Sequence, residues 1–162
     1  MNNPNPNHLF RALFFAPAIF ICHFLEEAPG FVEWINAHVS RDITSDLFWS
    51  VNLSGLAITV AIVGFAWLAR SSFSWALTIA WFSFLMLANA ILHIGGSFVD
   101  RGYVPGLVTA VVLYLPYYFW LATRIAKSGQ INFSVFIGAA VLGSTPMLIH
   151  GYWILFLGDR LF

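Results

Sequence analysis

The chain has 162 residues and no net charge, and 60% of its residues are hydrophobic while only 9% are charged. Soluble domains carry about 25% charged residues, and a soluble fold of this length could not bury so much apolar surface, so the composition excludes a water-soluble domain. The lack of a basic run argues against nucleic acid as a partner, and the single cysteine, Cys22, excludes an internal disulfide.

The first apolar segment follows a short start that is rich in Asn and Pro. Residues 1–8 are predicted to be disordered, and residues 9–28 are predicted to form a first span, close to the roughly 20 residues that a bilayer requires. Pro29 and Gly30 end this span. Residues 31–39 mix large apolar side chains with a Glu, an Asn and a His, which predicts a short amphipathic helix at the membrane interface.

Four further apolar segments follow along the chain. They cover residues 47–69, 73–99, 104–123 and 131–157. Pro116 and Pro146 fall inside the last two segments, where they are expected to kink the helices, as membrane bundles tolerate. The predicted fold is therefore an all-α membrane protein of one domain, a bundle of five transmembrane helices with one short interfacial helix after the first span.

The Lys and Arg residues outside the spans predict an orientation. Five spans place the two termini on opposite sides of the membrane. The N-terminal side holds Arg11, Arg70, Arg124 and Lys127, and the other side holds Arg41, Arg101 and Arg160. Because the side with more Lys and Arg is usually cytoplasmic, the sequence predicts a cytoplasmic N-terminus, in the inner (plasma) membrane of the cell.

Few residues inside the spans can ionise. They are His23, Glu26 and Glu27 in the first span, His93 in the third and His150 in the fifth. Such groups are costly at membrane depth, so they usually face the bundle interior and serve a function. Residues three or four apart on a helix share a face, so both carboxylates can lie beside His23, and Asn89 can lie beside His93.

The three histidines are predicted to lie at one depth. The first, third and fifth spans run in the same direction, and His23, His93 and His150 lie five, six and seven residues before the ends of these spans. At about 1.5 Å rise per residue, they lie roughly 8–10 Å below the same surface. Thr109, five residues into the fourth span from that side, falls in the same layer. The sequence therefore predicts one polar site in this half of the bundle.

Imidazoles and carboxylates on facing helices are a ligand set for a divalent metal, with zinc or iron favoured and manganese as a third candidate. The predicted metal ligands are His23, Glu27, His93 and His150. Glu26 and Glu27 are the catalytic candidates, one as a ligand and the other as general base for a metal-activated water. Asn89 is expected to orient a histidine or carboxylate ligand without binding the metal itself.

Two other readings of these residues stay open. Two adjacent buried carboxylates resist ionising together, so Glu26 and Glu27 could form a metal-free acid/base pair in an isomerase or cyclase. The polar residues could also belong to a non-catalytic binding or transport protein. A lone histidine inside a helix is, moreover, more often a packing residue than a ligand.

Three short motifs resemble those of the HXXEE-domain membrane proteins. The first is the five-residue stretch that begins at His23 and ends at Glu27, and the second runs from Asn89 to His93 in the pattern NxxxH. The third, YxPGxxT, begins at Tyr103 and ends at Thr109. The resemblance implies a small multi-span protein with no assigned reaction. It marks the motif residues for attention, which are His23, Glu26, Glu27, Asn89, His93, Tyr103, Pro105, Gly106 and Thr109.

The leading hypothesis is a multi-pass membrane enzyme with an intramembrane His/Glu metal site. Its expected partners are membrane lipids and a lipid-like or apolar small molecule, and a homo-oligomer is compatible with the sequence. Tyr103 and Thr109 are assigned to the surroundings of the metal or to substrate contact, with Tyr103 near the interface at the mouth of the site.

Overall fold

The computed structural model describes residues 6–161, and every regular element within them is a helix. Five helical stretches are long and apolar enough to cross a membrane, which confirms the predicted all-α bundle and its spans to within a few residues. They are Leu9–Glu27, Ser45–Ala69, Ser72–Asp100, Leu107–Lys127 and Phe133–Leu157.

The predicted disordered lead falls partly outside the described residues, which begin at residue 6. For residues 6–8 the prediction is wrong, because helix α1 (Pro6–Leu13) already includes them. Proline suits the first turn of a helix, where its missing N–H has no partner to lose, so the helix starts before the apolar run does.

The first two spans are separated by a short helix. The first consists of α1 and α2 (Phe15–Glu27), and α3 (Phe31–Asn36) follows it, shorter than the predicted 31–39. The second span is α4 (Ser45–Ala69), where the Thr44 hydroxyl accepts a hydrogen bond of 3.2 Å from the Leu47 amide. This side-chain cap is of the kind that favours a helix start.

The last three spans each contain a π-helical turn. The third span is α5 (Ser72–Phe82), η1 (Ser83–Ala88) and α6 (Asn89–Asp100). The fourth is α7 (Leu107–Thr109), η2 (Ala110–Tyr114) and α8 (Leu115–Lys127), and the fifth is α9 (Phe133–Tyr152) and η3 (Trp153–Leu157). Such turns are rare and often lie at functional sites. Here they directly precede Asn89, directly follow Thr109 and begin three residues after His150.

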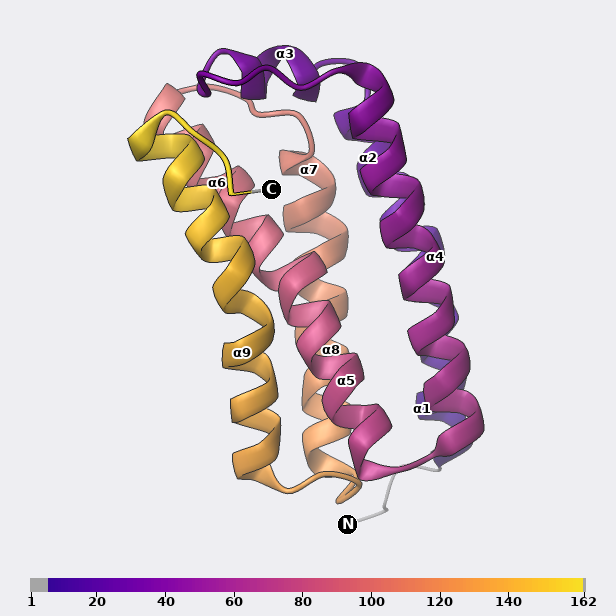
Figure 1. Ribbon diagram of the computed structural model, residues 1–162. Helices are drawn as coiled ribbons and strands as arrows, with labels where there is room; N and C mark the ends of the chain where they lie inside the picture. The colour runs from indigo at the N-terminus through magenta and orange to yellow at the C-terminus, as the bar shows by residue number, and fades with distance from the viewer. Residues whose placement is uncertain (1–5, 162) are drawn as a thin grey trace.

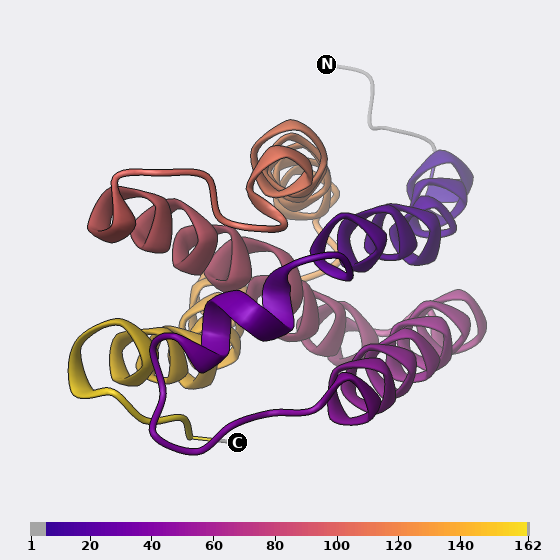
Figure 2. The same ribbon diagram turned by 90° about the horizontal axis from the view of Figure 1, so that it is seen from above.

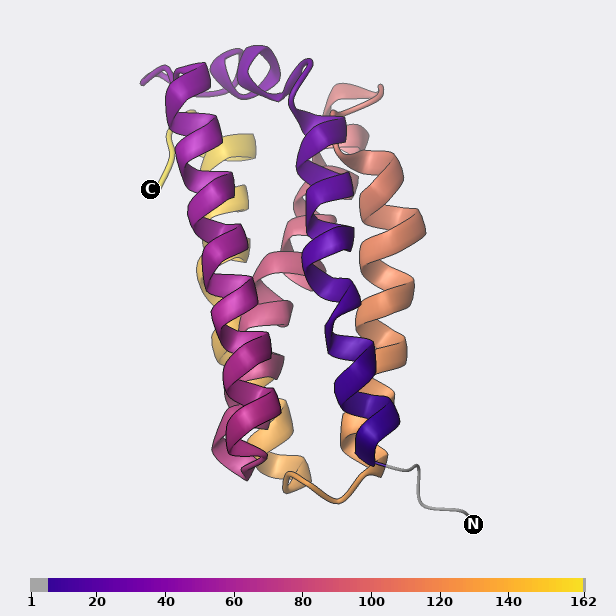
Figure 3. The same ribbon diagram turned by 90° about the vertical axis from the view of Figure 1, so that its right-hand side faces the viewer.

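The spans surround a tilted central helix. The third span, α5 to α6, crosses the middle of the bundle and is the most buried of the five (Figure 1). Seen from above, α2, α7–α8, α9 and α4 stand around it, and α3 lies across the end of the bundle (Figure 2). The side view places α1 at the opposite end from α3 (Figure 3). We call these the α3 end and the α1 end.

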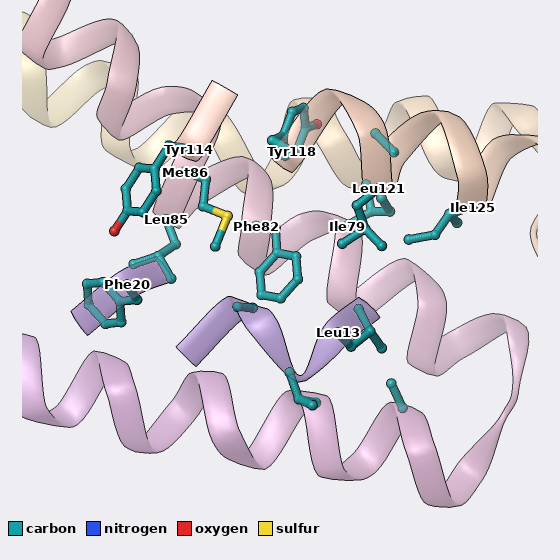
Figure 4. Close-up of a cluster of buried hydrophobic side chains, with 14 of the residues drawn as sticks. Leu13, Phe20, Ile79, Phe82, Leu85, Met86, Tyr114, Tyr118, Leu121 and Ile125 are labelled. Carbon is teal, nitrogen blue, oxygen red and sulfur yellow. The ribbon is translucent and has the colours of Figure 1, made fainter. Parts of the chain in front are cut away.

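An apolar core fills the bundle between the α1 end and its middle. Figure 4 shows these side chains as a continuous row that includes Leu13 of α1, Ile79 of α5 and Leu121 and Ile125 of α8. Each of these four is at most 1% exposed. Lipid tails are as apolar as these side chains, so close van der Waals packing, rather than removal from water, holds the α1 end in one arrangement.

Helix α3 is attached to the end of α6 by polar contacts. The Trp34 indole donates to one oxygen of Asp100 at 2.6 Å, and His38 Nε2 lies 2.9 Å from the other. Burial disfavours the charged imidazole, but hydrogen bonds to the Trp34 carbonyl and to Asp100 outweigh it and raise the pKa of His38 above its usual value. Trp34 also lies against Gly96, where a Cβ would approach its ring to 2.8 Å.

Candidate metal centre

Three of the predicted site residues come together near the α3 end. His93 Nε2 lies 3.1 Å and His23 Nε2 lies 3.4 Å from the same oxygen, Oε1 of Glu27. One ligand atom from each of the three residues lies within 4.8 Å of the others. The exposed fractions are 1% for His23, 4% for Glu27 and 0% for His93, so the group is closed to bulk water.

The helices position these side chains from two directions. His23 and Glu27 are four residues apart at the end of α2 and so share one helix face, as the spacing predicts. His93 comes from α6, one turn after η1 ends. The rings of His23 and His93 meet edge to face with their centroids 5.0 Å apart.

Gly106 closes the group on a third side. Its φ of +92° lies in the left-handed region, and a Cβ there would approach His93 Cε1 to 2.7 Å, Glu27 Cγ to 2.9 Å and His23 Cε1 to 3.1 Å. Both facts require glycine, because any side chain would be strained and would displace the three site residues. The third motif therefore packs its glycine directly against the residues of the first two.

Thr109 contacts His23 at Nδ1, the ring nitrogen that does not face Glu27. His23 Nδ1 lies 2.8 Å from the Thr109 hydroxyl oxygen, and this hydroxyl lies 3.3 Å from the Gly106 carbonyl, to which it donates. This contact holds the His23 ring at Nδ1, so its other nitrogen, Nε2, faces Glu27.

Glu26 does not join this group. Its carboxylate accepts hydrogen bonds from the Tyr103 hydroxyl at 2.7 Å, from the Val108 amide at 3.0 Å and from the Thr109 amide at 2.7 Å. These amides lie in the first turn of α7, where a helix leaves its backbone N–H donors unpaired. Glu26 accepts from them and therefore caps the start of α7. Burial and the hydrogen bond to Glu26 raise the pKa of Tyr103 to about 12. The geometry gives no support for a paired-carboxylate mechanism.

His150 also lies outside the three-residue group. It is 7% exposed, and its Nδ1 accepts a hydrogen bond of 3.1 Å from the Leu161 amide, in the segment that folds back after η3. Its side chain lines the same cavity as His23 and Glu27. His150 thus lines the cavity without joining the group, because depth along a span says nothing about which way a side chain points across the bundle.

Two further residues contribute to the surroundings of the site. Asn89 lines the cavity, and its buried side-chain oxygen has no hydrogen-bond partner among the described residues. Tyr114 lies with its ring centroid 4.1 Å from that of His23, and its buried hydroxyl has no hydrogen-bond partner among the described residues. Figure 4 shows Tyr114 at the end of the apolar row that Phe20 also occupies. Helical spacing does not relate Tyr114 to His23, because Tyr114 lies in η2, in another span.

A cavity of about 500 Å³ adjoins the group. Such a volume is in the range of small-molecule sites, about 300–1,000 Å³. Its walls come from α2, the α3–α4 region, α4, the third span and α9, and they are mostly apolar. Representative lining residues are Phe20, Phe31, Phe48, Trp81, Leu85 and Met147.

The three ligand atoms have the spacing and chemistry for a metal ion. Two ligands of a tetrahedral zinc with bonds of 2.0–2.1 Å are about 3.3 Å apart, and the two distances to Glu27 Oε1 bracket that value. Neither Nε2 makes a hydrogen bond to any described residue, although both are buried. Their closest polar neighbour is the Glu27 carboxylate oxygen, so the two nitrogens and this oxygen face one another, as the ligands of a shared ion do.

The comparisons with known proteins agree with the motifs. A family model described as "Protein of unknown function with HXXEE motif" matches residues 14–121. A search of curated proteins and a search of solved structures each found no match. The matched region contains all three motifs and the whole His23–Glu27–His93 group. The chain therefore belongs to the HXXEE family, whose function is unknown.

Proposed function

We propose that the protein is a membrane-embedded, metal-dependent enzyme that acts on a lipid-like or other apolar substrate, by hydrolysis, hydroxylation or a related step. The observation that carries the proposal is the convergence of three buried ligand atoms from two spans, at the wall of a cavity of about 500 Å³. A polar group placed where a span could be wholly apolar calls for a function.

The charge of the group favours a cation. Glu27 is 4% exposed, and an ionised carboxylate is very unfavourable in a buried site without a cation beside it. A divalent ion held by Glu27, His23 and His93 would balance this charge and would bind both Nε2 atoms. Two imidazoles and one carboxylate leave further coordination positions open, as catalytic zinc and non-haem iron sites do, and manganese is the third candidate.

The surrounding residues have separable roles in this proposal. A bound ion would polarise a substrate oxygen or activate a water molecule. Thr109 fixes the ring orientation of His23 through the contact at Nδ1, and Gly106 leaves room for the three side chains. Phe31, whose ring centroid lies 5.9 Å from that of His93, helps to keep bulk water away. Glu26 acts as a positioning residue, because it holds the segment that carries Gly106 and Thr109.

Metal analysis of purified protein tests the proposal. Wild-type protein, prepared without chelator, is expected to contain one divalent ion per chain by mass spectrometry, and His93→Ala is expected to contain none. His150→Ala is the matched control, because it removes a buried histidine outside the group, and it should keep its metal. Circular dichroism confirms that each variant folds. A wild-type protein without stoichiometric metal, or a His93→Ala variant that retains it, contradicts the proposal.

A further inference from the structure

The cavity beside the metal-binding group reaches the lipid-facing surface between α4 and α9. Leu47, Val51 and Ile58 of α4 line it, yet 37%, 58% and 44% of their surfaces are exposed, so they mark its mouth. On the far wall, Met147 and His150 belong to α9. In Figure 2 these two helices stand apart, and the segment after α3 passes over the space between them. Both helices are membrane spans, so this mouth opens sideways toward lipid.

A cation lines the same cavity near the α3 end. Arg160 is half-buried, and its Nε is fully buried without a hydrogen-bond partner among the described residues. The adjacent carboxylate is already engaged, because Asp159 accepts from Arg41 Nε at 3.0 Å and Nη2 at 2.9 Å. Arg41 also donates to the Arg160 carbonyl at 2.9 Å, which fixes the backbone at this point. Within residues 6–161 the guanidinium of Arg160 has no salt bridge.

Charge and shape together indicate the class of ligand. Asp159 attracts the Arg160 guanidinium at longer range, but no described carboxylate forms a salt bridge with it. A carboxylate or phosphate in the cavity could therefore bind this guanidinium with two hydrogen bonds. The remaining walls are apolar, with Phe48, Trp81 and Leu85 among them. A molecule with one anionic end and one apolar chain satisfies both parts of this cavity.

We propose that the cavity binds a single-chain amphiphile that enters sideways from the bilayer between α4 and α9. Its anionic head group, a carboxylate or a phosphate, pairs with Arg160, and its chain extends along the apolar walls past His23 and Glu27. This inference rests on the proposed function for the chemistry performed on the chain, since it names the substrate class of that metal centre. The binding itself requires only the cavity and Arg160.

A binding assay with the fluorescent polyene fatty acid cis-parinaric acid tests this inference. Energy transfer from protein tryptophans, of which Trp81 lines the cavity, reports binding to the detergent-solubilised protein. Arg160→Gln is expected to weaken binding about 10-fold to 100-fold, because it removes a charged hydrogen-bonding partner. Arg101→Gln is the matched control, since it removes an exposed cation at the same membrane surface away from the cavity, and it should bind as wild type does.

Three further arms complete the experiment. The methyl ester of the probe should bind the wild type weakly, and Arg160→Gln should leave the affinity for the ester unchanged. An alkyl phosphate that displaces the probe better than an alkyl carboxylate of the same length assigns a phosphate head group, and the reverse order assigns a carboxylate. Ser54→Trp, which places a large ring at the α4 side of the mouth, should block binding while Arg160 is intact.

The metal content of the same samples separates this inference from the proposed function. Binding that depends on Arg160 in a protein without metal supports the amphiphile site and removes the metal centre. Equal affinities of Arg160→Gln and Arg101→Gln for the acid, in samples that melt as wild type does, overturn the amphiphile site whatever the metal content. An ester that binds as tightly as the acid also overturns it.

Discussion

The two ends of the bundle are built from the same apolar spans, but they differ in how closely their side chains pack and in how many of their buried polar atoms are hydrogen-bonded. At the α1 end, Leu13, Ile79 and Ile125 fill the interior, and the start of α5 is closed by a reciprocal pair of hydrogen bonds between Ser71 and Ser74. At the α3 end the spans contain π-helical turns, a cavity and buried polar atoms that make no hydrogen bond to any described residue.

The unpaired polar atoms show the difference most directly. Seven buried side-chain atoms in the described part of the chain have no hydrogen-bond partner, and six of them belong to residues of the site or cavity; these are His23, Asn89, His93, Tyr114 and Arg160. Only the Trp75 indole lies elsewhere. Proteins break packing and pairing rules mainly at functional sites, so the contrast supports the proposal that the α3 end binds a ligand while the α1 end stabilises the bundle.

The largest effect is expected at the α1 end. Trp75 is 0% exposed and its ring lies 5.0 Å from that of Phe10. Trp75→Ala should lower the free energy of unfolding by about 3–5 kcal/mol, measured by denaturant titration in detergent. Phe73→Ala, on the same helix but 68% exposed, should change it by less than about 0.5 kcal/mol. Equal effects of the two changes would show that the α1 end does not supply the stability.

A smaller effect is expected where the third motif meets the site. Gly106→Ala should cost about 1–3 kcal/mol through its left-handed backbone alone, and the added Cβ should also displace His93 and Glu27. We therefore expect lower thermal stability together with reduced metal content. Gly129→Ala, also at positive φ but with open space around it, is the control for backbone strain and should retain its metal. Normal metal content in Gly106→Ala would disprove the close packing.

Thr109 offers a change that affects binding without unfolding. Thr109→Val removes the hydroxyl that holds His23 Nδ1 but keeps the shape, so we expect metal affinity to fall about 10-fold to 100-fold. Thr109→Ser keeps the hydroxyl and should stay near wild type. Metal titration with a competing chelator measures both. An unchanged affinity in Thr109→Val would mean that this hydrogen bond does not orient a ligand.

The smallest effect concerns the attachment of α3. Because the pKa of His38 is raised in the folded state, the contact with Asp100 adds stability that is fully present below the unfolded pKa of about 6.5. This stability is lost as the pH rises through the folded pKa. The pair is partly exposed, so the gain should be below about 1 kcal/mol. Melting temperature should fall slightly between about pH 6 and pH 8 in wild type but not in His38→Gln.

Much of the fold and part of the site could be predicted from the sequence. The spans, the interfacial helix and the pairing of His23 with Glu27 follow from apolar length and from helical spacing. The sequence could not predict that Glu27 would join the site and that Glu26 would not. Adjacent residues point about 100° apart on a helix, so one side chain enters the site and the other caps α7, and only the position of the neighbouring helix decides which.

The sequence by itself determined that this chain forms five apolar spans and predicted one depth for His23, His93 and His150, because apolar length and rise per residue follow from local chemistry alone. The tertiary structure decided which polar groups meet. It gathered His23, Glu27 and His93 against Gly106, and it turned His150 toward Leu161. The rotation of each span about its own axis depends on close approaches and π-helical turns, and hydrophobicity that is nearly uniform around a helix does not encode it.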